Sequence, residues 1–257
     1  MRVDDDDRPP VLGAADLELS FGGVKAVDGV ALDIRAGEIH GLLGDNGAGK
    51  STTLKLLAGV LQPDNGQIYF EGEPIKMKSP RTARGLGVET VYQDLSLADT
   101  LDVVQNIFSG REMRYRWGVV RRRQMEAAAR KLLAELDVQI PGTTRPVRSL
   151  SGGQRQGTAI ARAVGWGSRV LLLDEPTAAL GVAEREHVLS LMRTLRGRGI
   201  GILLISHNLP DVFSVADRLT ILRRGRNIAT MRVDEIDQRQ VVALITGADS
   251  TDADPGP

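Results

Sequence analysis

One short segment limits the folds open to this chain more than any other: residues 44–51, which read GDNGAGKS. This spacing of glycines before Lys-Ser matches a phosphate-binding loop. An apolar run, Ile39 to Leu43, precedes the loop, and a helical pattern, Lys50 to Val60, follows it. A strand, a glycine-rich turn and a helix in that order predict an α/β domain with a site for a phosphate-bearing ligand.

Each residue type in the loop suits a triphosphate. Glycines let the backbone turn its N–H groups inward around the anion, and the following helix points its positive end at the same place. Lys50 is placed to reach the β- and γ-phosphates, and the Ser51 hydroxyl to ligate Mg²⁺. The alternative is a glycine-rich turn that caps an ordinary helix. We expect a site for a triphosphate and Mg²⁺ formed by Gly44, Asn46, Gly47, Ala48, Gly49, Lys50, Ser51 and Thr52.

Short apolar runs alternate with helical patterns along most of the chain. Residues 170–173 and 200–205 are continuous apolar runs, typical of strands covered on both faces. Between them, Glu184 to Arg196 has a helical apolar stripe, with acids in its first turn and arginines in its last. Strands that alternate with helices predict a mainly parallel sheet.

The stretch from about 95 to 158 breaks this alternation, and we interpret it as a helical subdomain inserted into a single domain at 11–247. The core of that domain is expected at about 11–94 and 159–232, with a last helix at about 234–246. Polar segments at 1–10 and 248–257 predict a disordered lead and tail. The helical stripe of the insert consists of Met125, Ala128, Ala129, Leu132, Leu133 and Leu136.

Two acids follow the apolar run at 170–173 directly. An acid at the end of a buried strand can face the phosphate loop, so Asp174 is expected to hold Mg²⁺ directly or through water. Glu175 is the better candidate for polarising an attacking water. The alternative is a pair of solvated acids that cap the next helix.

Two further polar residues are placed by their position in the pattern. His207 follows the strand at 202–205 and therefore lies at the edge where open α/β sheets bind ligands, so we expect it to contact the γ-phosphate. Gln93 lies where the core meets the insert, and we expect it to sense the metal and the attacking water. His40 and His187 are expected to be structural or solvated.

A second helix start has the features of an anion site. Residues 150–154, which read LSGGQ, open a helix rich in small residues, Gln156 to Val164. Ser151 and Gln154 have the spacing of a capping box. Two consecutive glycines are poor choices in a first helical turn unless the backbone must approach something closely. With Ser151 they favour an anion at this helix N-terminus.

These motifs together resemble the ATP-binding cassette (ABC) family, in the family's order and over residues 11 to 230. The resemblance implies a P-loop NTPase fold with a mainly parallel core, an antiparallel β subdomain at the N-terminal side and the helical insert. It also implies a head-to-tail dimer in which each ATP lies between one phosphate loop and the partner's signature, residues 150–154. Ser151 and Gly153 would then bind the γ-phosphate across the dimer, and Gln154 would belong to the same nucleotide-binding set.

Two positions need separate comment. Phe21 matches the family's aromatic that stacks on adenine, and a core strand residue is an equal alternative. Gly181 stands where the family usually has an Asp that helps to join the two sites, so the resemblance leaves the coupling between sites in question.

A finer resemblance points to cassettes that serve ribose-, xylose- or fructose-type uptake. It implies an ATPase peripheral to the cytoplasmic face of the inner (plasma) membrane, with transmembrane permease subunits, a second cassette as a homodimer, and an extracytoplasmic solute-binding protein. The alternatives are an ABC ATPase of DNA repair, chromosome maintenance or translation, and a non-catalytic nucleotide-binding regulator. The segments that carry this resemblance are 41–46, 92–97, 106–112 and 175–180.

Composition excludes several classes of function. The 33 basic residues balance 33 acidic ones, which gives no general attraction to nucleic acid, and we interpret Arg121 to Arg123 as a solvated face. The chain has no cysteine, so disulfides and thiolate-bound metals are excluded. Because no apolar run approaches the ~18–20 residues that span a bilayer, and the acidic N-terminus is no secretory signal, a membrane role must come through a partner.

Overall fold

The computed structural model describes residues 9–248. The lead expected at 1–10 and the tail expected at 248–257 lie mostly outside the described residues. Pro10, expected in the lead, is instead the first residue of strand β1, where its backbone pairs with Arg35 of β2. A proline fits there because the first position of a strand can do without an N–H donor.

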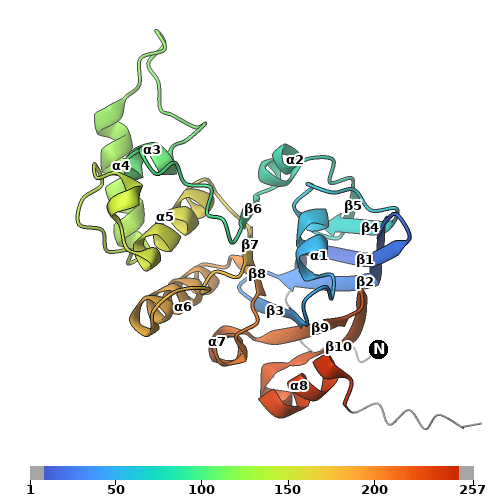
Figure 1. Ribbon diagram of the computed structural model, residues 1–257. Helices are drawn as coiled ribbons and strands as arrows, with labels where there is room; N and C mark the ends of the chain where they lie inside the picture. The colour runs from blue at the N-terminus through green and yellow to red at the C-terminus, as the bar shows by residue number, and fades with distance from the viewer. Residues whose placement is uncertain (1–8, 249–257) are drawn as a thin grey trace, which may run out of the picture.

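Ten strands in the described chain form two sheets (Figure 1). The antiparallel sheet has the order β2-β1-β4-β5, from β1 (Pro10–Phe21), β2 (Val24–Arg35), β4 (Asn65–Phe70) and β5 (Glu73–Ile75). The larger sheet has the order β10-β9-β3-β8-β7-β6, from β3 (Ile39–Gly44), β6 (Val88–Val91), β7 (Val170–Asp174), β8 (Gly201–Ile205), β9 (Arg218–Arg223) and β10 (Arg226–Arg232).

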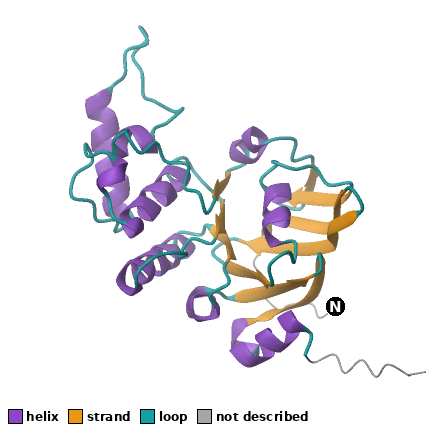
Figure 2. Ribbon diagram, viewed as in Figure 1, coloured by secondary structure: helices purple, strands orange, loops and turns teal. Residues whose placement is uncertain are grey.

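In the larger sheet all strands except β10 run parallel. The carboxyl ends of β3, β6, β7 and β8 therefore meet at one edge. The mainly parallel core and the antiparallel sheet at the N-terminal side are confirmed. The helices are α1 (Lys50–Leu57), α2 (Pro80–Gly85), α3 (Val103–Ile107), α4 (Arg122–Glu135), α5 (Gly152–Val164), α6 (Val182–Gly197), α7 (Leu209–Val215) and α8 (Gln238–Thr246). In Figure 2, α3 to α6 lie to the left of the sheets, α7 and α8 lie below, α2 lies above and α1 lies among the strands.

The central strands are buried on both faces, as their continuous apolar runs predict. Leu171 and Leu173 pack in one apolar cluster with helices α3 to α6, whereas Val170 and Leu172 pack in a second cluster with α1 and the antiparallel sheet. Because successive side chains point to opposite faces of a strand, one short run supplies both clusters. Because β7 is buried on both faces, the position of Asp174 and Glu175 at its carboxyl end is fixed.

Several helix ends differ from their expected positions. Helix α1 ends at Leu57 rather than Val60, because Gly59 has φ +71° and leaves helical geometry. Helix α5 begins at Gly152, directly after its expected cap Ser151, but it continues past the expected subdomain boundary at 158. The last helix begins at Gln238 rather than 234, since Asp237 caps it through a capping box.

The helical stripe of the insert packs as expected. Met125, Ala129, Leu133 and Leu136 are buried in the cluster that α3 to α6 share. Arg121 is the N-cap of α4, so Arg122 and Arg123 lie in its first turn. Within residues 9–248, no helix is both long and apolar enough to cross a membrane.

Candidate functional site

The phosphate loop is a rigid turn between β3 and α1. Gly44, Gly47 and Gly49 have φ values of +150°, +78° and +100°. A Cβ on Gly44 would lie 2.3 Å from the Leu222 carbonyl oxygen, and a Cβ on Gly49 would lie 2.6 Å from the Ala26 carbonyl oxygen. Only glycine fits both the dihedral angles and the space, so two flanking strands fix the shape of the loop.

Lys50 points its charge into the loop. Its Nζ donates to the carbonyl oxygens of Gly44 at 2.8 Å and of Asp45 at 2.9 Å, and the side chain is largely buried. Burial lowers the pKa of Lys50, and the nearby charges of Glu175, Asp45 and Asp174 oppose that shift. The ammonium group therefore stands where phosphate oxygens would enter.

One cavity of about 380 Å³ at the carboxyl edge of the parallel sheet brings most of the predicted residues together. Gly44, the first glycine of the loop, does not line it. Ala26 and Ile205 also line the cavity, and no sequence signal marked them. The predicted residues that line it are Phe21, Asn46, Gly47, Ala48, Gly49, Lys50, Ser51, Thr52, Gln93, Asp174 and Glu175.

Phe21 is the last residue of β1, and its side chain faces this cavity rather than the core. It is 53% exposed, whereas the core residues of β1 are buried. The interpretation of Phe21 as a core strand residue is wrong, because β1 extends past the apolar cluster at this point. A flat base entering the cavity would meet an exposed aromatic face.

The donors in the cavity fit a magnesium ion held together with phosphates. Asp174 accepts a hydrogen bond from the Ser51 hydroxyl, and burial, followed by the charge of Glu175, raises the pKa of Asp174. Across residues 9–248, no group of three or more His, Cys, Asp or Glu side chains forms a metal site by itself. Mg²⁺ commonly takes one or two carboxylates and completes its shell with water and substrate phosphates. Ser51, Gln93 and Asp174 offer such a partial set.

Glu175 and His207 form a pair at the same edge. Nδ1 of His207 lies 2.6 Å from Oε2 of Glu175. The Glu175 side chain is 17% exposed and that of His207 is 72% exposed. The backbone of Glu175 has φ +53°, and its N–H donates to the Ile205 carbonyl at 2.9 Å. The end of β8 thus holds both residues, and His207 reaches the cavity through Glu175.

The signature lies apart from this cavity. Ser151 caps α5 as predicted: its Oγ accepts from the Gln154 N–H at 3.4 Å, and its own N–H donates to Gln154 Oε1 at 3.1 Å. Ser151, Gly153 and Gln154 line a different cavity of about 310 Å³. Within one chain the structure therefore does not bring the signature to the phosphate loop.

Glu184 of α6 is a neighbour of the signature that sequence reasoning missed. A Cβ on Gly153 would lie 3.0 Å from Cβ of Glu184, so the glycine lets α6 approach the start of α5. Hydrogen bonds from the Ser151 hydroxyl and from the N–H groups of Gly153 and Gly181 lower the pKa of Glu184. Within its own helix end, Glu184 accepts from the Gly181 N–H at 3.4 Å, but no sequence signal pointed to its contact with α5.

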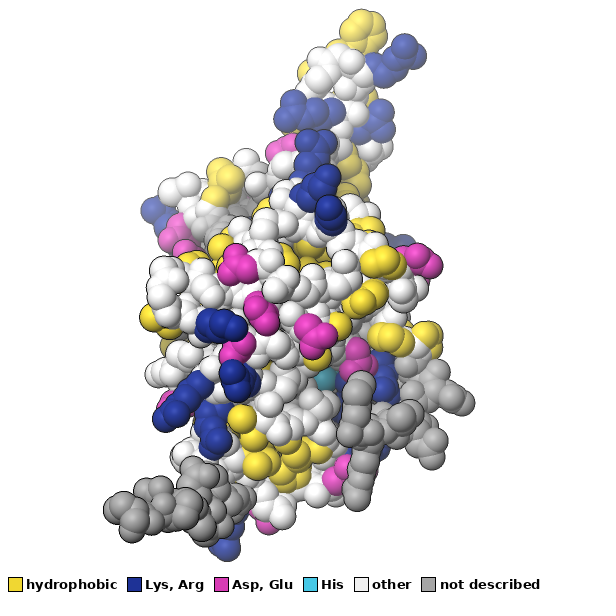
Figure 3. Space-filling view, turned by 90° about the vertical axis from the view of Figure 1, so that its right-hand side faces the viewer, with side chains coloured by type: hydrophobic (Ala, Val, Ile, Leu, Met, Phe, Trp, Pro, Cys, Tyr) yellow, Lys and Arg dark blue, Asp and Glu magenta, His cyan; other side chains and the backbone are white. Residues whose placement is uncertain are grey.

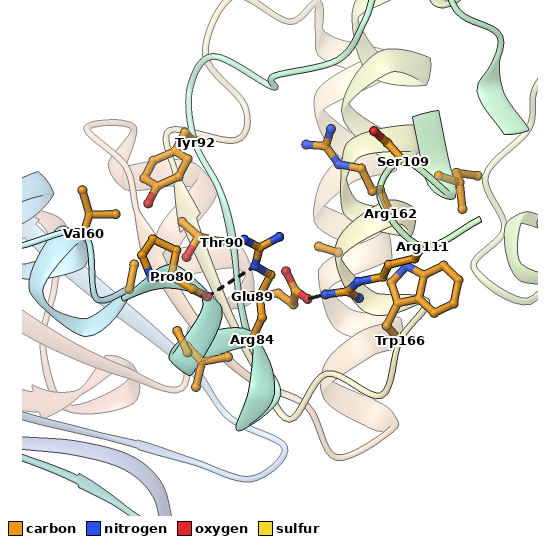
Figure 4. A pocket seen from close by; sticks show the side chains of 15 residues that line it. Val60, Pro80, Arg84, Glu89, Thr90, Tyr92, Ser109, Arg111, Arg162 and Trp166 are labelled. Atoms are coloured by element: carbon orange, nitrogen blue, oxygen red, sulfur yellow. Dashed lines mark hydrogen bonds and ion pairs between the residues drawn. The ribbon is translucent and has the colours of Figure 1, made fainter. Parts of the chain in front are cut away.

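A groove of about 390 Å³ separates the core from the helical insert (Figure 4). From the insert, Arg111 donates to Glu89 of the core at 2.7 Å and lies over the Trp166 ring at 5.3 Å. Tyr92 lines this groove, and the next residue, Gln93, lines the cavity of the phosphate loop. A two-residue segment after β6 thus connects the groove with the cavity. Gln93 was predicted to lie at this junction, whereas no sequence pattern indicated the groove.

Comparison with known proteins agrees with this arrangement. Residues 27–178 match the family model described as "ABC transporter". The xylose/arabinose import ATP-binding protein XylG of Sulfolobus acidocaldarius is 44% identical over 92% of this chain and 94% of that protein. The fructose import ATP-binding protein FrcA of Rhizobium meliloti is 46% identical over 93% of this chain and 95% of that protein.

A solved structure shows the same fold. The crystal structure of an ATP-binding cassette of an ABC transporter in its ADP conformation superposes with a TM-score of 0.79 at 26% identity, covering 92% of this chain and 95% of that one. The phosphate loop, the acid pair and the inserted helices all lie within the matched part of the chain. The chain therefore belongs to the ABC transporter family, as one of its ATP-binding, ATP-hydrolysing cassettes.

Proposed function

We propose that this chain hydrolyses ATP to drive the import of a sugar across a membrane. The observation that carries the ATPase part is the single cavity that Lys50, Asp174, Glu175 and Gln93 line together with the rest of the phosphate loop. The sugar part is supported by the relatives, which are named as xylose/arabinose and fructose import proteins. These names also weigh against a role in DNA repair, chromosome maintenance or translation.

Each residue of the site has a separate role in the proposed hydrolysis. Lys50 and the N–H groups of the loop hold the β- and γ-phosphates. Ser51, Gln93 and Asp174 would hold Mg²⁺, which, when bound, neutralises charge on the phosphate oxygens. Glu175 orients the water in line with the γ-phosphate and accepts its proton, and His207 fixes the Glu175 carboxylate through their 2.6 Å contact. Phe21 supports the adenine from the side.

A second copy of this chain completes the site in our proposal. The signature helix presents Ser151, Gly153 and Gln154 outside its own nucleotide cavity. In a head-to-tail homodimer, the N-terminus of α5 would meet the γ-phosphate that the other copy holds. Hydrolysis removes that shared contact, and the dimer opens.

Transmembrane permease subunits are the partners that turn this opening into transport. We place their contact in the groove between core and insert, because Tyr92 and Gln93 connect that groove with the cavity. The assembly would sit peripherally on the cytoplasmic face of the inner membrane, with an extracytoplasmic solute-binding protein delivering the sugar. The inserted helices are proposed to move as a subdomain, over about 95–158, when ATP closes the dimer.

The test uses the purified chain with MgATP. We expect the rate per molecule to rise with protein concentration, Lys50→Ala to lose ATP binding, and Ser151→Ala to bind ATP but lose hydrolysis. Ser149→Ala is the matched control, since Ser149 lies two residues earlier and donates to the Pro146 carbonyl. A chain without affinity for ATP, or a rate indifferent to concentration and to Ser151, contradicts the proposal. Sugar uptake by vesicles that carry the chain with its permease tests the transport part.

A further inference from the structure

Residues 111–123, which we call the arginine hairpin, project from the insert and run into the first turn of α4 (Figure 1). Arg114 pairs with Val120 in an antiparallel bridge, the Tyr115 N–H donates to the Val119 carbonyl at 2.8 Å, and the Arg121 N–H donates to the Met113 carbonyl at 2.7 Å. The turn closes at Gly118, which has φ +83°. The hairpin is therefore an ordered element with a defined tip.

The tip of the hairpin is apolar and almost fully in solvent. Trp117 is 90% exposed, and three neighbours are also well exposed, Tyr115, Val119 and Val120. Figure 3 shows the projection with dark blue basic side chains along it and a yellow side chain at its end. An exposed tryptophan close to two exposed valines, on a projection held by backbone hydrogen bonds, indicates a surface that is covered in the working protein.

The flanks of the hairpin carry a strong local positive charge. The segment has six arginines and one acid, Glu112. Some of this charge is paired: Arg111 with Glu89, Arg122 with Asp102, and Arg114 with Glu112. Arg121 stacks over the Tyr115 ring at 4.4 Å. Among residues 9–248, Arg116 and Arg123 have no acidic partner, and both are exposed.

We propose that the arginine hairpin binds an anionic lipid bilayer, with Trp117 at the level of the headgroups and the arginines on their phosphates. Tryptophan and tyrosine favour the membrane–water interface because their rings are both apolar and polar. Clustered arginines beside them are attracted to the negative surface of anionic lipids. The net charge of the chain is zero, so this attraction is local to the hairpin and orients the molecule.

Other partners suit the hairpin less well. Nucleic-acid sites on single strands line a groove with cations and aromatics, whereas here the cations surround a projecting tip. A stable protein interface needs roughly 800 Å² from each partner, and a tip of a few residues offers less. The hairpin begins at Arg111, which lines the groove proposed for the permease, so a bilayer contact would lie beside that groove. The inference adds to the proposed function a direct lipid contact that does not depend on ATP hydrolysis.

Flotation with lipid vesicles tests the inference on the full chain. The wild type should float with vesicles of phosphatidylcholine and phosphatidylglycerol and not with phosphatidylcholine alone. Trp117→Ala should abolish flotation, and Arg116→Ala and Arg123→Ala should each weaken binding about fivefold, from about 1 kcal/mol for each arginine near such a surface. Arg145→Ala, an exposed arginine elsewhere in the insert, is the matched control. All four variants should hydrolyse ATP like the wild type, which separates this test from that of the ATPase.

Fluorescence gives a second measurement, because the chain has only two tryptophans. In Trp166→Phe protein, the emission of Trp117 should shift to the blue with anionic vesicles and be quenched by bromine-labelled lipid. Unchanged emission, or equal flotation of Trp117→Ala and wild type, overturns the inference. A shift with single-stranded oligonucleotides but not with vesicles would overturn it in favour of nucleic acid. Binding only to vesicles that contain the permease would overturn it in favour of that protein.

Discussion

Nδ1 of His207 lies 2.6 Å from Oε2 of Glu175, at the carboxyl ends of two neighbouring parallel strands. The carboxylate is mostly buried and the imidazole mostly exposed, so the pair spans the rim of the nucleotide cavity. With Nδ1 donating to the carboxylate, Nε2 is left to face solvent or a phosphate oxygen. The histidine therefore holds the carboxylate in one orientation before any water is attacked.

The first prediction concerns Glu175→Gln. The amide keeps the size of the side chain but cannot accept the proton of water, so ATP binding should persist while turnover falls by about 10²–10⁴-fold. Hydrolysis assays and nucleotide titrations check this, and light scattering with MgATP should show a trapped dimer. Glu186→Gln, an exposed glutamate of α6 that pairs with Arg193, is the control. Normal turnover in Glu175→Gln would refute the role of Glu175.

The second prediction concerns Phe21. If its ring stacks on adenine, Phe21→Ala should weaken ATP binding by about 1–3 kcal/mol, the usual contribution of a base stacked on an aromatic ring. Phe21→Tyr should keep the affinity. The discriminating measurement is tripolyphosphate binding, which should be equal in all three proteins because that ligand has no base. A parallel loss of tripolyphosphate affinity would show that Phe21 supports the loop instead.

The third prediction concerns Glu184, whose carboxylate lies against the Ser151 hydroxyl and the Gly153 N–H that we assign to the partner's γ-phosphate. In a closed dimer this negative charge would oppose the phosphate. Glu184→Gln retains an oxygen that can accept from the Gly181 N–H and removes the charge, so half-maximal hydrolysis should need less ATP. Glu186→Gln again serves as the control. Weaker dimerisation in Glu184→Gln would mean that the carboxylate orients Ser151 rather than competing for it.

The sequence was informative wherever local patterns determine structure. The phosphate loop, the acids after β7 and the capping box at Ser151 each occupy consecutive or closely spaced residues, so their geometry follows from short-range sterics and hydrogen bonds. The buried strands were predictable because burial on both faces demands a continuous apolar run. The spacing of these motifs along the chain then placed Asp174 and Glu175 beside the loop, at the shared edge of a parallel sheet.

Contacts between residues distant in the sequence could not be predicted. The approach of Glu184 to Gly153 depends on how α6 packs against α5, and neither helix encodes it alone. The alternating pattern around Phe21 was equally consistent with a core strand. Only the fold shows that β1 extends beyond the apolar cluster in which its other residues are buried. The groove at Tyr92 exists because the core and the helical insert meet there. Such features belong to packing rather than to any single motif.

The last prediction rests on His40, a fully buried residue of β3. Its Nε2 lies 2.7 Å from Thr220 Oγ1, and its Nδ1 lies 3.1 Å from a guanidinium nitrogen of Arg218. Burial, followed by the charge of Arg218 and more weakly that of Arg35, lowers the pKa of His40 to about 3, against an opposing effect of Asp33. The expectation that His40 is structural is thereby confirmed, whereas His187 is exposed.

This shift determines how stability depends on pH. The unfolded chain protonates His40 near the ordinary histidine pKa of 6.5, whereas the folded chain does so only near 3. Between these pH values the unfolded state binds more protons than the folded state. The contribution of neutral His40 to the free energy of unfolding is therefore complete above pH 6.5 and is lost as the pH falls, at up to about 1.4 kcal/mol per pH unit. His40→Gln should be less stable at neutral pH but lose less stability than the wild type between about pH 7 and about pH 5. Urea unfolding at several pH values measures both slopes, with His187→Gln expected to follow the wild type. Equal slopes in wild type and His40→Gln would show that folding does not lower the pKa of His40.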